Sequence, residues 1–519
     1  MSQFYDQASL VMVPSGYKNG KVYSQKPLST DGELTFTRSN DTATRVNSSG
    51  LIEKVRTNVA LYSNDFSNAA WAKLDNATVS GIRVADPFGG NTAWQVIFDG
   101  SSNGRIEQTI GSLINNGTYT TSFYLRVASG TVSAFVINDA VTITTTWQRF
   151  SSIETITGTD AYPRFRCNTA ATIQVYAGQF ELSDFGATDY IATTSAAVSV
   201  GPVANLPRLD YSGGCPSLLL EPQRTNLLQY SDGLVPAQAF GATLTKNSIV
   251  SPDGYQNASL FTPSGGAGGV TLMTSSFSGY YTISVYLKGS VNGQKVRAFG
   301  DLQSTIIDWT ITTEWVRYTA TFNATNPTGQ SIYLLAGSYF TPSQNNPFYV
   351  YGAQIEAGAY ATSYIPTIAA TTRGAEVCNL LSMSSGVASG ATAGTLFIEL
   401  EHKLNSTAGD SFVFGQTNGT FPAGRGYIYA ADSGFADSFG GGGFAIPQSQ
   451  TVKMIFRMNS LSNANIFQNG VKGATVSGTA WAAINSIQFR GAYASMKVKQ
   501  ILFSKSALTD AQCIELTTL

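Results

Sequence analysis

An internal repeat is the feature that most constrains how this 519-residue chain can fold. Residues 51–58 read LIEKVRTN and residues 219–226 read LLEPQRTN, so Arg56 and Arg224 lie 168 positions apart. Residues 147–150 (WQRF) and 315–318 (WVRY) have the same separation, and residues 175–181 (VYAGQFE) match residues 350–356 (VYGAQIE). Ordered matches at a nearly constant offset predict two copies of one domain of about 150 residues.

Short stretches of alternating apolar and polar residues predict that both copies are built from β-strands. In residues 281–287 (YTISVYL), Tyr281, Ile283, Val285 and Leu287 share one face of an expected strand. Charged residues are only 12% of the chain, about half the usual share. The 60 aromatic residues exclude a largely disordered chain, and the absence of Ala/Glu/Lys/Leu/Arg heptads excludes a coiled coil. We therefore expect an all-β protein made of antiparallel two-sheet sandwiches.

The region from about Thr372 to the end is expected to be a third sandwich. Residues 396–401 alternate like a half-buried strand, and Asn469 with Gly470 predicts a hairpin. Thr509 and Gln512 have the spacing of a capping box and predict one short helix through Leu516.

Residues 1 to about 50 differ from all three regions and are too few to form a core of their own. We expect them to pack on the first sandwich, on another subunit or on a partner protein. On this view, deleting residues 1–30 leaves the three sandwiches folded.

The balance of charge argues against two classes of partner. Lys and Arg total 31 against 32 Asp and Glu, a net charge of -1, whereas a nucleic-acid binder normally has a basic excess. No run of about 18 apolar residues predicts a membrane span. The first ten residues do not resemble a secretion signal, so we expect synthesis in a cytoplasm. The four cysteines are expected to be reduced and buried or half-buried: Cys167, Cys215, Cys378 and Cys513.

Several strings resemble virion appendage proteins of tailed bacteriophages, which occur as head fibres, tail fibres or spikes. The resemblance is carried by residues 9–18 (SLVMVPSGYK), 36–38 (FTR), 43–47 (ATRVN), 50–53 (GLIE), 216–226 (PSLLLEPQRTN) and 507–511 (ALTDA). Such proteins contain jelly rolls like those of carbohydrate-binding modules and a lectin sandwich like that of concanavalin A or laminin G. The strings identify a scaffold, and fold-level analogy implies a role on the virion more than any chemistry.

The resemblance implies four parts. Residues 1–50 would be an attachment segment that binds phage capsid or tail proteins, and residues 51–200 and 201–371 would be the two jelly rolls. Residues 372–519 would be the concanavalin A-like domain, which is the most distal part if the N-terminus is the anchor. The resemblance also implies that the cytoplasm of synthesis is that of a host bacterium. We expect a non-enzymatic protein of the virion surface that forms a homo-oligomer, most simply a trimer. The alternative is a polysaccharide-degrading enzyme or a soluble lectin on the same folds.

Catalytic signals in the sequence are weak. His402 is the single histidine, and its place at the end of an expected strand predicts a surface position. Glu399 and Glu401 share a strand face, as in some lectin-fold glucanases, but the Asp that such enzymes carry between two glutamates is missing. No cofactor is expected. A bound calcium ion is an open alternative. Asp410, Asp432 and Asp437 are expected in loops, but their spacing does not match a known calcium-binding motif.

Aromatic side chains are the best candidates for contacts with glycans. Trp147 and Trp315 occupy equivalent places in the repeat and are expected to anchor the cores. The candidates for glycan binding are the unrepeated tryptophans and a nearby tyrosine pair: Trp94, Trp309, Trp481, Tyr427 and Tyr429. The alternative for each is packing in a core, at an edge or in an interface.

Overall fold

The structure is a computed structural model. It describes the chain except at residues 1, 102, 301–304, 325–328, 382, 385, 389–390, 405–409, 416–425, 430–433, 438–443, 446–449, 461–462, 478–485 and 519. The protein is all-β, as predicted, and consists of β-sandwiches. It divides into two compact units: residues 55–201 with 255–257 form one, and residues 1–54, 202–254 and 258–519 form the other.

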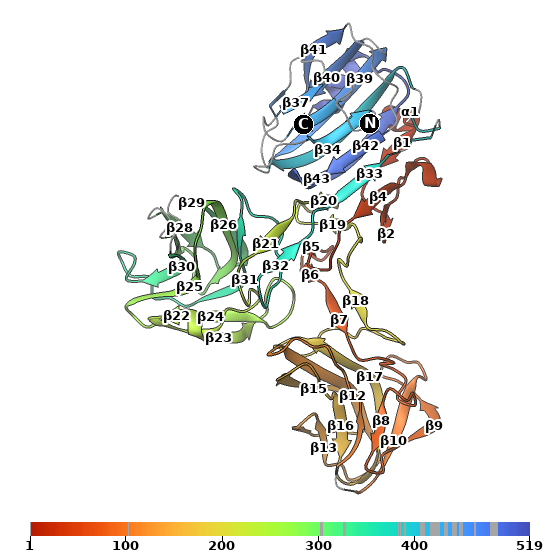
Figure 1. Cartoon of the computed structure of the whole chain (residues 1–519), viewed down its shortest axis with the longest axis vertical. Coiled ribbons are helices and arrows are strands. Elements are labelled where there is room, and N and C mark those ends of the chain that lie inside the picture. Colours follow the sequence, from red (N-terminus) through yellow and green to blue (C-terminus); the bar gives the residue numbers. More distant parts are fainter. Residues whose placement is uncertain are drawn as a thin grey trace. The chain divides into compact units, whose positions relative to one another are not determined.

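The first jelly roll is the smaller unit and contains two five-stranded sheets (Figure 1). One sheet has the order β15-β12-β17-β10-β9, with strands β9 (Thr78–Val84), β10 (Ala93–Asp99), β12 (Thr118–Gly130), β15 (Gln148–Thr155) and β17 (Ala170–Leu182). The other has the order β14-β13-β16-β11-β8, with β8 (Ala72–Leu74), β11 (Gly104–Glu107), β13 (Ala134–Val136), β14 (Asp139–Val141) and β16 (Arg164–Cys167). β7 (Arg56–Asn58) and β18 (Val198–Val200) pair where the chain enters and leaves the domain.

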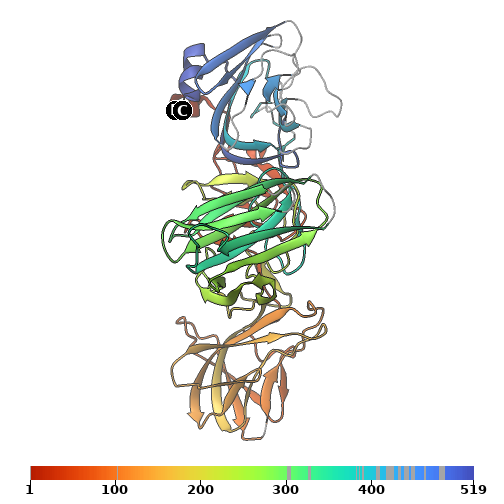
Figure 2. The same cartoon turned by 90° about the vertical axis from the view of Figure 1, so that its left-hand side faces the viewer.

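The second jelly roll repeats this plan, and Figure 2 shows its strands in green. One sheet has the order β23-β24-β31-β26-β29, with β23 (Ala242–Ile249), β24 (Ala258–Pro263), β26 (Gly279–Gly289), β29 (Val316–Ala324) and β31 (Phe348–Ala357). The other has the order β22-β25-β30-β27-β28, with β22 (Ala239–Phe240), β25 (Ala267–Ser275), β27 (Gln294–Gly300), β28 (Thr305–Ile311) and β30 (Gln330–Gly337); η2 (Pro236–Gln238) precedes β22. β21 (Arg224–Asn226) and β32 (Thr371–Arg373) pair as β7 and β18 do in the first copy. As predicted, Ile283, Val285 and Leu287 lie together in the core.

The C-terminal sandwich has an eight-stranded and a nine-stranded sheet. The first contains β1 (Leu10–Met12), β19 (Arg208–Asp210), β20 (Ser217–Leu220), β34 (Gly394–Leu404), β39 (Thr451–Ser460), β40 (Asn463–Gln468), β41 (Val471–Ser477) and β43 (Ala494–Ser504). The second contains β2 (Tyr17–Lys18), β3 (Lys21–Val22), β4 (Leu34–Thr37), β33 (Val377–Leu380), β35 (Asp410–Gly415), β36 (Gly426–Tyr429), β37 (Gly434–Asp437), β38 (Phe444–Ala445) and β42 (Ser486–Arg490). The remaining elements are α1 (Ser2–Gln7), η1 (Thr30–Gly32), β5 (Thr44–Val46), β6 (Ile52–Lys54) and α2 (Asp510–Thr517).

The N-terminal segment is part of the C-terminal sandwich, which none of the three expected placements included. β1 pairs with β43, and β4 pairs with β33. Leu10, Met12 and Val22 are fully buried in the core of this sandwich. The expectation that residues 1–30 are dispensable for folding is therefore wrong, because these residues supply core side chains. β19 and β20 lie within residues 201–371, which were expected to form the second jelly roll. In the structure they extend a sheet of the C-terminal sandwich instead.

Local predictions for this sandwich are largely confirmed. Asn469 and Gly470 both have positive φ between β40 and β41, as a tight hairpin turn requires. Thr509 caps α2 with the predicted capping box. The strand at residues 396–401 is half-buried as predicted, with Leu396, Ile398 and Leu400 in the core and Glu399 and Glu401 partly exposed. Phe397 is the exception on the second face, because it packs with Phe4 of α1 and Cys513 of α2. In the described part of the chain, no helix is long and apolar enough to cross a membrane.

Candidate functional site

The repeated sequence strings form the same buried hydrogen-bond network in both jelly rolls. Asn58 donates from Nδ2 to the Ile191 carbonyl (2.8 Å) and accepts from the Phe180 amide (3.0 Å). In the second copy, Asn226 makes the same bonds to Ile365 (2.8 Å) and Ile355 (3.1 Å). These asparagines tie the entry strand to the central strand and to the exit of each domain, so the repeat strings are structural.

A second repeated network surrounds a buried carboxylate. Glu181 accepts from the Thr188 amide (2.8 Å) and from Gln179 Nε2 (2.6 Å). Glu356 accepts equivalent bonds from Thr362 and Gln354, both 2.7 Å. This network is also structural, so a function that belongs to one copy depends on residues at which the two copies differ.

Both jelly rolls carry a pair of tyrosines on the outer face of one sheet, and the residues around this pair differ between the two copies. In the first jelly roll, Tyr124 on β12 lies directly opposite Tyr176 on β17. In the second, Tyr286 on β26 lies opposite Tyr351 on β31. The side chains next to them in sequence point into the core, so these tyrosines face away from it.

In the second jelly roll, this face is covered by the chain itself. Tyr351 and Tyr364 are only 1% and 2% exposed and pack with Ile52 of β6. Lys54 Nζ, also on β6, lies 2.8 Å from Asp232 Oδ2 and 2.9 Å from Asp253 Oδ2. We call Asp232, Asp253, Tyr351 and Tyr364 the closed seat.

Hydrogen bonds join the tyrosines and carboxylates of the closed seat. The Tyr351 hydroxyl donates to Asp253 (2.9 Å), and the Tyr364 hydroxyl donates to Asp232 (2.5 Å). Burial alone would lower the pKa of Lys54, but the charges of Asp232 and Asp253 raise it overall. Lys54 therefore stays charged inside the seat.

In the first jelly roll, the equivalent face is open. The loops align so that Phe88 stands where the second copy has Asp253, and Asn64 stands where it has Asp232. Phe88 is 68% exposed, and its ring centroid lies 5.6 Å from that of Tyr124 and 5.9 Å from that of Tyr176. We call Phe88, Tyr124 and Tyr176 the open aromatic face.

The loop that carries Phe88 is organised by one carboxylate. Asp86 accepts from the amides of Phe88 (2.9 Å) and Gly90 (3.1 Å) and from Thr92 Oγ1 (2.7 Å). The Thr92 hydroxyl, followed by the backbone amides, holds the pKa of Asp86 below its usual value. Because a Cβ at Gly90 would approach Asp86 Oδ2 to 2.4 Å, this tight loop favours glycine there.

Polar groups border the open aromatic face. Arg126 and Gln174, which are paired across β12 and β17, hydrogen-bond through Arg126 Nε and Gln174 Oε1. The Arg126 guanidinium also lies over the half-buried Trp147 ring, 4.8 Å from its centroid. One exposed and two half-buried rings can stack on the apolar face of a sugar, and the neighbouring guanidinium and amide can bond its hydroxyls.

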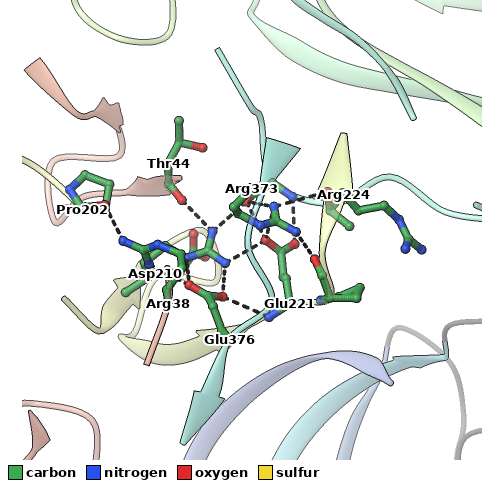
Figure 3. Close-up of polar contacts among 12 residues, drawn as sticks. Arg38, Thr44, Pro202, Asp210, Glu221, Arg224, Arg373 and Glu376 are labelled. Atoms are coloured by element: carbon green, nitrogen blue, oxygen red, sulfur yellow. Dashed lines mark hydrogen bonds and ion pairs between the residues drawn. The ribbon is translucent and has the colours of Figure 1, made fainter. Parts of the chain in front are cut away.

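A buried cluster of charges lies outside these faces, in the larger unit (Figure 3). Glu376 accepts from Arg38 Nη1 and Arg208 Nε, each at 2.8 Å, and Arg208 and Arg373 both bond Glu221. Burial would raise the pKa of Glu221, but the charges of Arg373 and Arg208 hold it far below its usual range. Nearly complete burial leaves no room for a ligand, so this cluster joins the N-terminal segment, β19, β32 and β33 structurally.

The sequence-predicted aromatic candidates do not gather in one place. Trp94 and Trp309 are each 7% exposed and lie in the cores of the two jelly rolls. Arg83 covers the Trp94 ring at 3.5 Å, and Trp309 lies 5.5 Å from Tyr318. Both placements correspond to the packing alternative. Trp481 lies outside the described residues, and of Tyr427 and Tyr429 in β36 only the backbone is described.

The repeated tryptophans are less buried than expected. Trp147 and Trp315 are half-buried, and the fully buried core tryptophan is Trp71. Sequence reasoning missed all three rings of the open aromatic face, Phe88, Tyr124 and Tyr176. The signal that could have found them is the difference between the copies at residues 88 and 253 within an otherwise repeated frame.

His402 is not at the surface, contrary to the prediction. It is fully buried, with Nε2 3.0 Å from Ser411 Oγ, and burial lowers its pKa to about 4. Glu399 bonds Gln500 (2.7 Å), and Glu401 lies 3.5 Å from Lys499 Nζ, so both are engaged on the outer strand face.

Two further predictions concern cysteines and metal. Cys167, Cys378 and Cys513 are buried free thiols, as predicted, but Cys215 is exposed because it lies in the turn between β19 and β20. Among the described residues, no group of three potential ligands from His, Cys, Asp and Glu could hold a metal ion. Asp410 and Asp437 lie on β35 and β37 instead of in loops, and Asp432 falls outside the described residues.

No protein-family model and no curated protein sequence matches the chain. Among solved structures it is similar to the Ruminococcus gnavus IT-sialidase CBM40 bound to α2,3-sialyllactose, with 12% identity over 25% of this chain and 84% of that chain and a TM-score of 0.21. It is also similar to the CBM22-1–CBM22-2 tandem domain of Paenibacillus barcinonensis Xyn10C (13% identity, 58% and 96% coverage, TM-score 0.23). A mutant of CBM29-2, a family 29 carbohydrate-binding module, is a third (16% identity, 26% and 91% coverage, TM-score 0.18). At these identities and TM-scores, we take the function from the residues of this chain alone.

Proposed function

We propose that this chain is a structural, non-enzymatic appendage of a tailed-bacteriophage virion that displays β-sandwich domains for adhesion to host-surface glycans. The virion role is supported by the sequence strings that resemble such appendages. The adhesive role is supported by one observation, the open aromatic face of the first jelly roll. Glycan contact is thereby proposed at Phe88, Tyr124 and Tyr176 in place of the tryptophans chosen from the sequence.

The position of the N-terminal segment also changes where contact is proposed. Residues 1–50 are still the proposed contact with capsid or tail proteins, but their strands belong to the sheets of the C-terminal sandwich. An anchor made of this segment therefore includes the C-terminal sandwich. The first jelly roll is a separate unit and is the better candidate for contact with a cell.

The chemistry of the open aromatic face suits a sugar. Two rings on neighbouring strands and a third on a held loop provide an apolar surface for the C–H groups of a pyranose. Gln174 and Arg126 at its border offer an amide and a guanidinium to the hydroxyls. Each stacked ring is expected to contribute about 1 kcal/mol.

The test is binding of purified host capsular polysaccharide to the full chain. Tyr124→Ala and Phe88→Ala should each weaken binding about fivefold, which corresponds to the loss of about 1 kcal/mol. The matched control is Tyr162→Ala, which removes a 46% exposed tyrosine of the same domain that makes no ring contact with the open aromatic face. Equal binding by all three variants would refute glycan contact at this face.

The proposed absence of catalysis and the trimer have their own tests. Incubation with the same polysaccharide should release no reducing ends. Light scattering should give the mass of three chains, and a stable monomer at micromolar concentration would contradict the trimer. Negative-stain imaging of particles with a label at the C-terminus should locate the protein on head or tail.

A further inference from the structure

The closed seat of the second jelly roll holds its occupant in the way that a binding site holds a ligand. The Lys54 ammonium lies between two carboxylates and 5.8 Å from the centroid of the Tyr351 ring. Ile52 packs on the tyrosines beside it, and Tyr286 and Trp315 border the cluster. Two buried tyrosines and two carboxylates therefore hold one cation and one apolar side chain.

We propose that the closed seat is a second carbohydrate site, specific for sugars with a free amino group, and that β6 occupies it as an internal substitute for the sugar. The inference rests on the proposed function, because it takes the outer tyrosine face as the sugar-binding face of both jelly rolls. It adds a second site, a different ligand class and a means of closing it.

The charge of the seat selects the ligand class. Asp232 and Asp253 each bond a tyrosine hydroxyl and also the Lys54 ammonium. A neutral sugar in place of Lys54 would leave two neighbouring carboxylates without a cation, which is costly in a buried site. A protonated amino group on a pyranose supplies both the cation and the apolar ring face that Lys54 and Ile52 supply together. In the first jelly roll, Asn64 and Phe88 replace the two acids, so that site is not expected to prefer amino sugars.

The occupant belongs to a short local hairpin, in which the Asn47 amide donates to the Leu51 carbonyl (2.8 Å) and Arg45 pairs with Glu53 (2.7 Å). β6 has only three residues, which pair with β5, and the Ile52 amide donates to the Pro252 carbonyl (2.9 Å). Leu51 beside it is 38% exposed, and the Asp232 side chain is 33% exposed, so the rim of the seat is open to solvent. An external ligand can therefore compete with β6 by displacing a short strand.

The first experiment opens the seat in the full chain. The double variant Ile52→Ala with Lys54→Ala should bind a glucosamine tetrasaccharide in mildly acidic buffer at least about tenfold more tightly than the unaltered protein does. It should not gain affinity for the N-acetylglucosamine tetrasaccharide, which has the same backbone without the charge. The matched control is Glu53→Ala, which alters the residue between them, paired with Arg45 (2.7 Å), and leaves the occupant in place. A folded double variant that gains no affinity for the glucosamine tetrasaccharide would overturn the proposal.

The second experiment uses the unaltered protein and does not depend on the folding of a variant. Lys54 is acetylated by an amine-reactive ester, and the modification is measured by mass spectrometry with and without saturating glucosamine tetrasaccharide. Displacement of β6 should raise the rate at Lys54 several-fold and leave the rate at Lys73 unchanged. An unchanged rate at Lys54 would contradict the proposal. Loss of glycan binding at the open aromatic face would be a separate result, because neither experiment probes that face.

Discussion

Removal of Glu376 tests whether the buried charge cluster holds the larger unit together. Glu376 is fully buried and accepts from Arg38 Nη1 (2.8 Å), Arg208 Nε (2.8 Å) and the Glu221 amide (3.0 Å). Glu376→Ala leaves two guanidinium groups, themselves fully buried, without this carboxylate. Breaking a buried ion pair from one side costs about 3–5 kcal/mol. That is a large share of the roughly 5–15 kcal/mol by which proteins are stable.

Hydrogen exchange with mass spectrometry measures this loss separately in the two units. Peptides from β19 and β33 should exchange faster in Glu376→Ala, whereas peptides from the first jelly roll should not change, because it is a separate unit. The matched control is Asp308→Ala, which breaks the pair with Arg297 (2.6 Å) at a side chain that is 37% exposed. Such a pair contributes below about 1 kcal/mol. If Glu376→Ala were as mild as Asp308→Ala, the reasoning about the cluster would be refuted.

Three further predictions concern other parts of the chain. The pKa of His402 in the folded protein is about 4, below its ordinary 6.5. The free energy of unfolding should therefore fall by up to about 3 kcal/mol as the pH drops through this interval. Denaturation of His402→Gln at the same pH values should not show this fall. Asp86→Asn should free the loop of Phe88 and weaken polysaccharide binding several-fold with an unchanged melting temperature; equal affinity would show that the loop needs no anchor. Deletion of residues 1–30 should unfold the C-terminal sandwich, visible as rapid exchange in β43, and native protection there would contradict the role of β1.

Local features could be read from the sequence because each depends on a few neighbouring residues. The offset of 168 positions revealed the two jelly rolls, and their shared hydrogen bonds at Asn58 and Asn226 explain why those strings are repeated. The turn at Asn469 and the cap at Thr509 followed from backbone preference and side-chain chemistry at those positions.

Only the tertiary structure decided which distant segments meet. The apolar residues 10–12 favour a strand but do not indicate its partner, which is β43, almost the whole chain away. The same holds for burial: the surroundings of Trp94 and His402 come from segments remote in sequence, so their exposure is not a local property. Phe88 and Asp253 occupy equivalent loops, and the face of the second copy is closed because β6 packs on it. Pairing between distant strands and charges depends on the whole packing arrangement, and local periodicity carries no information about it.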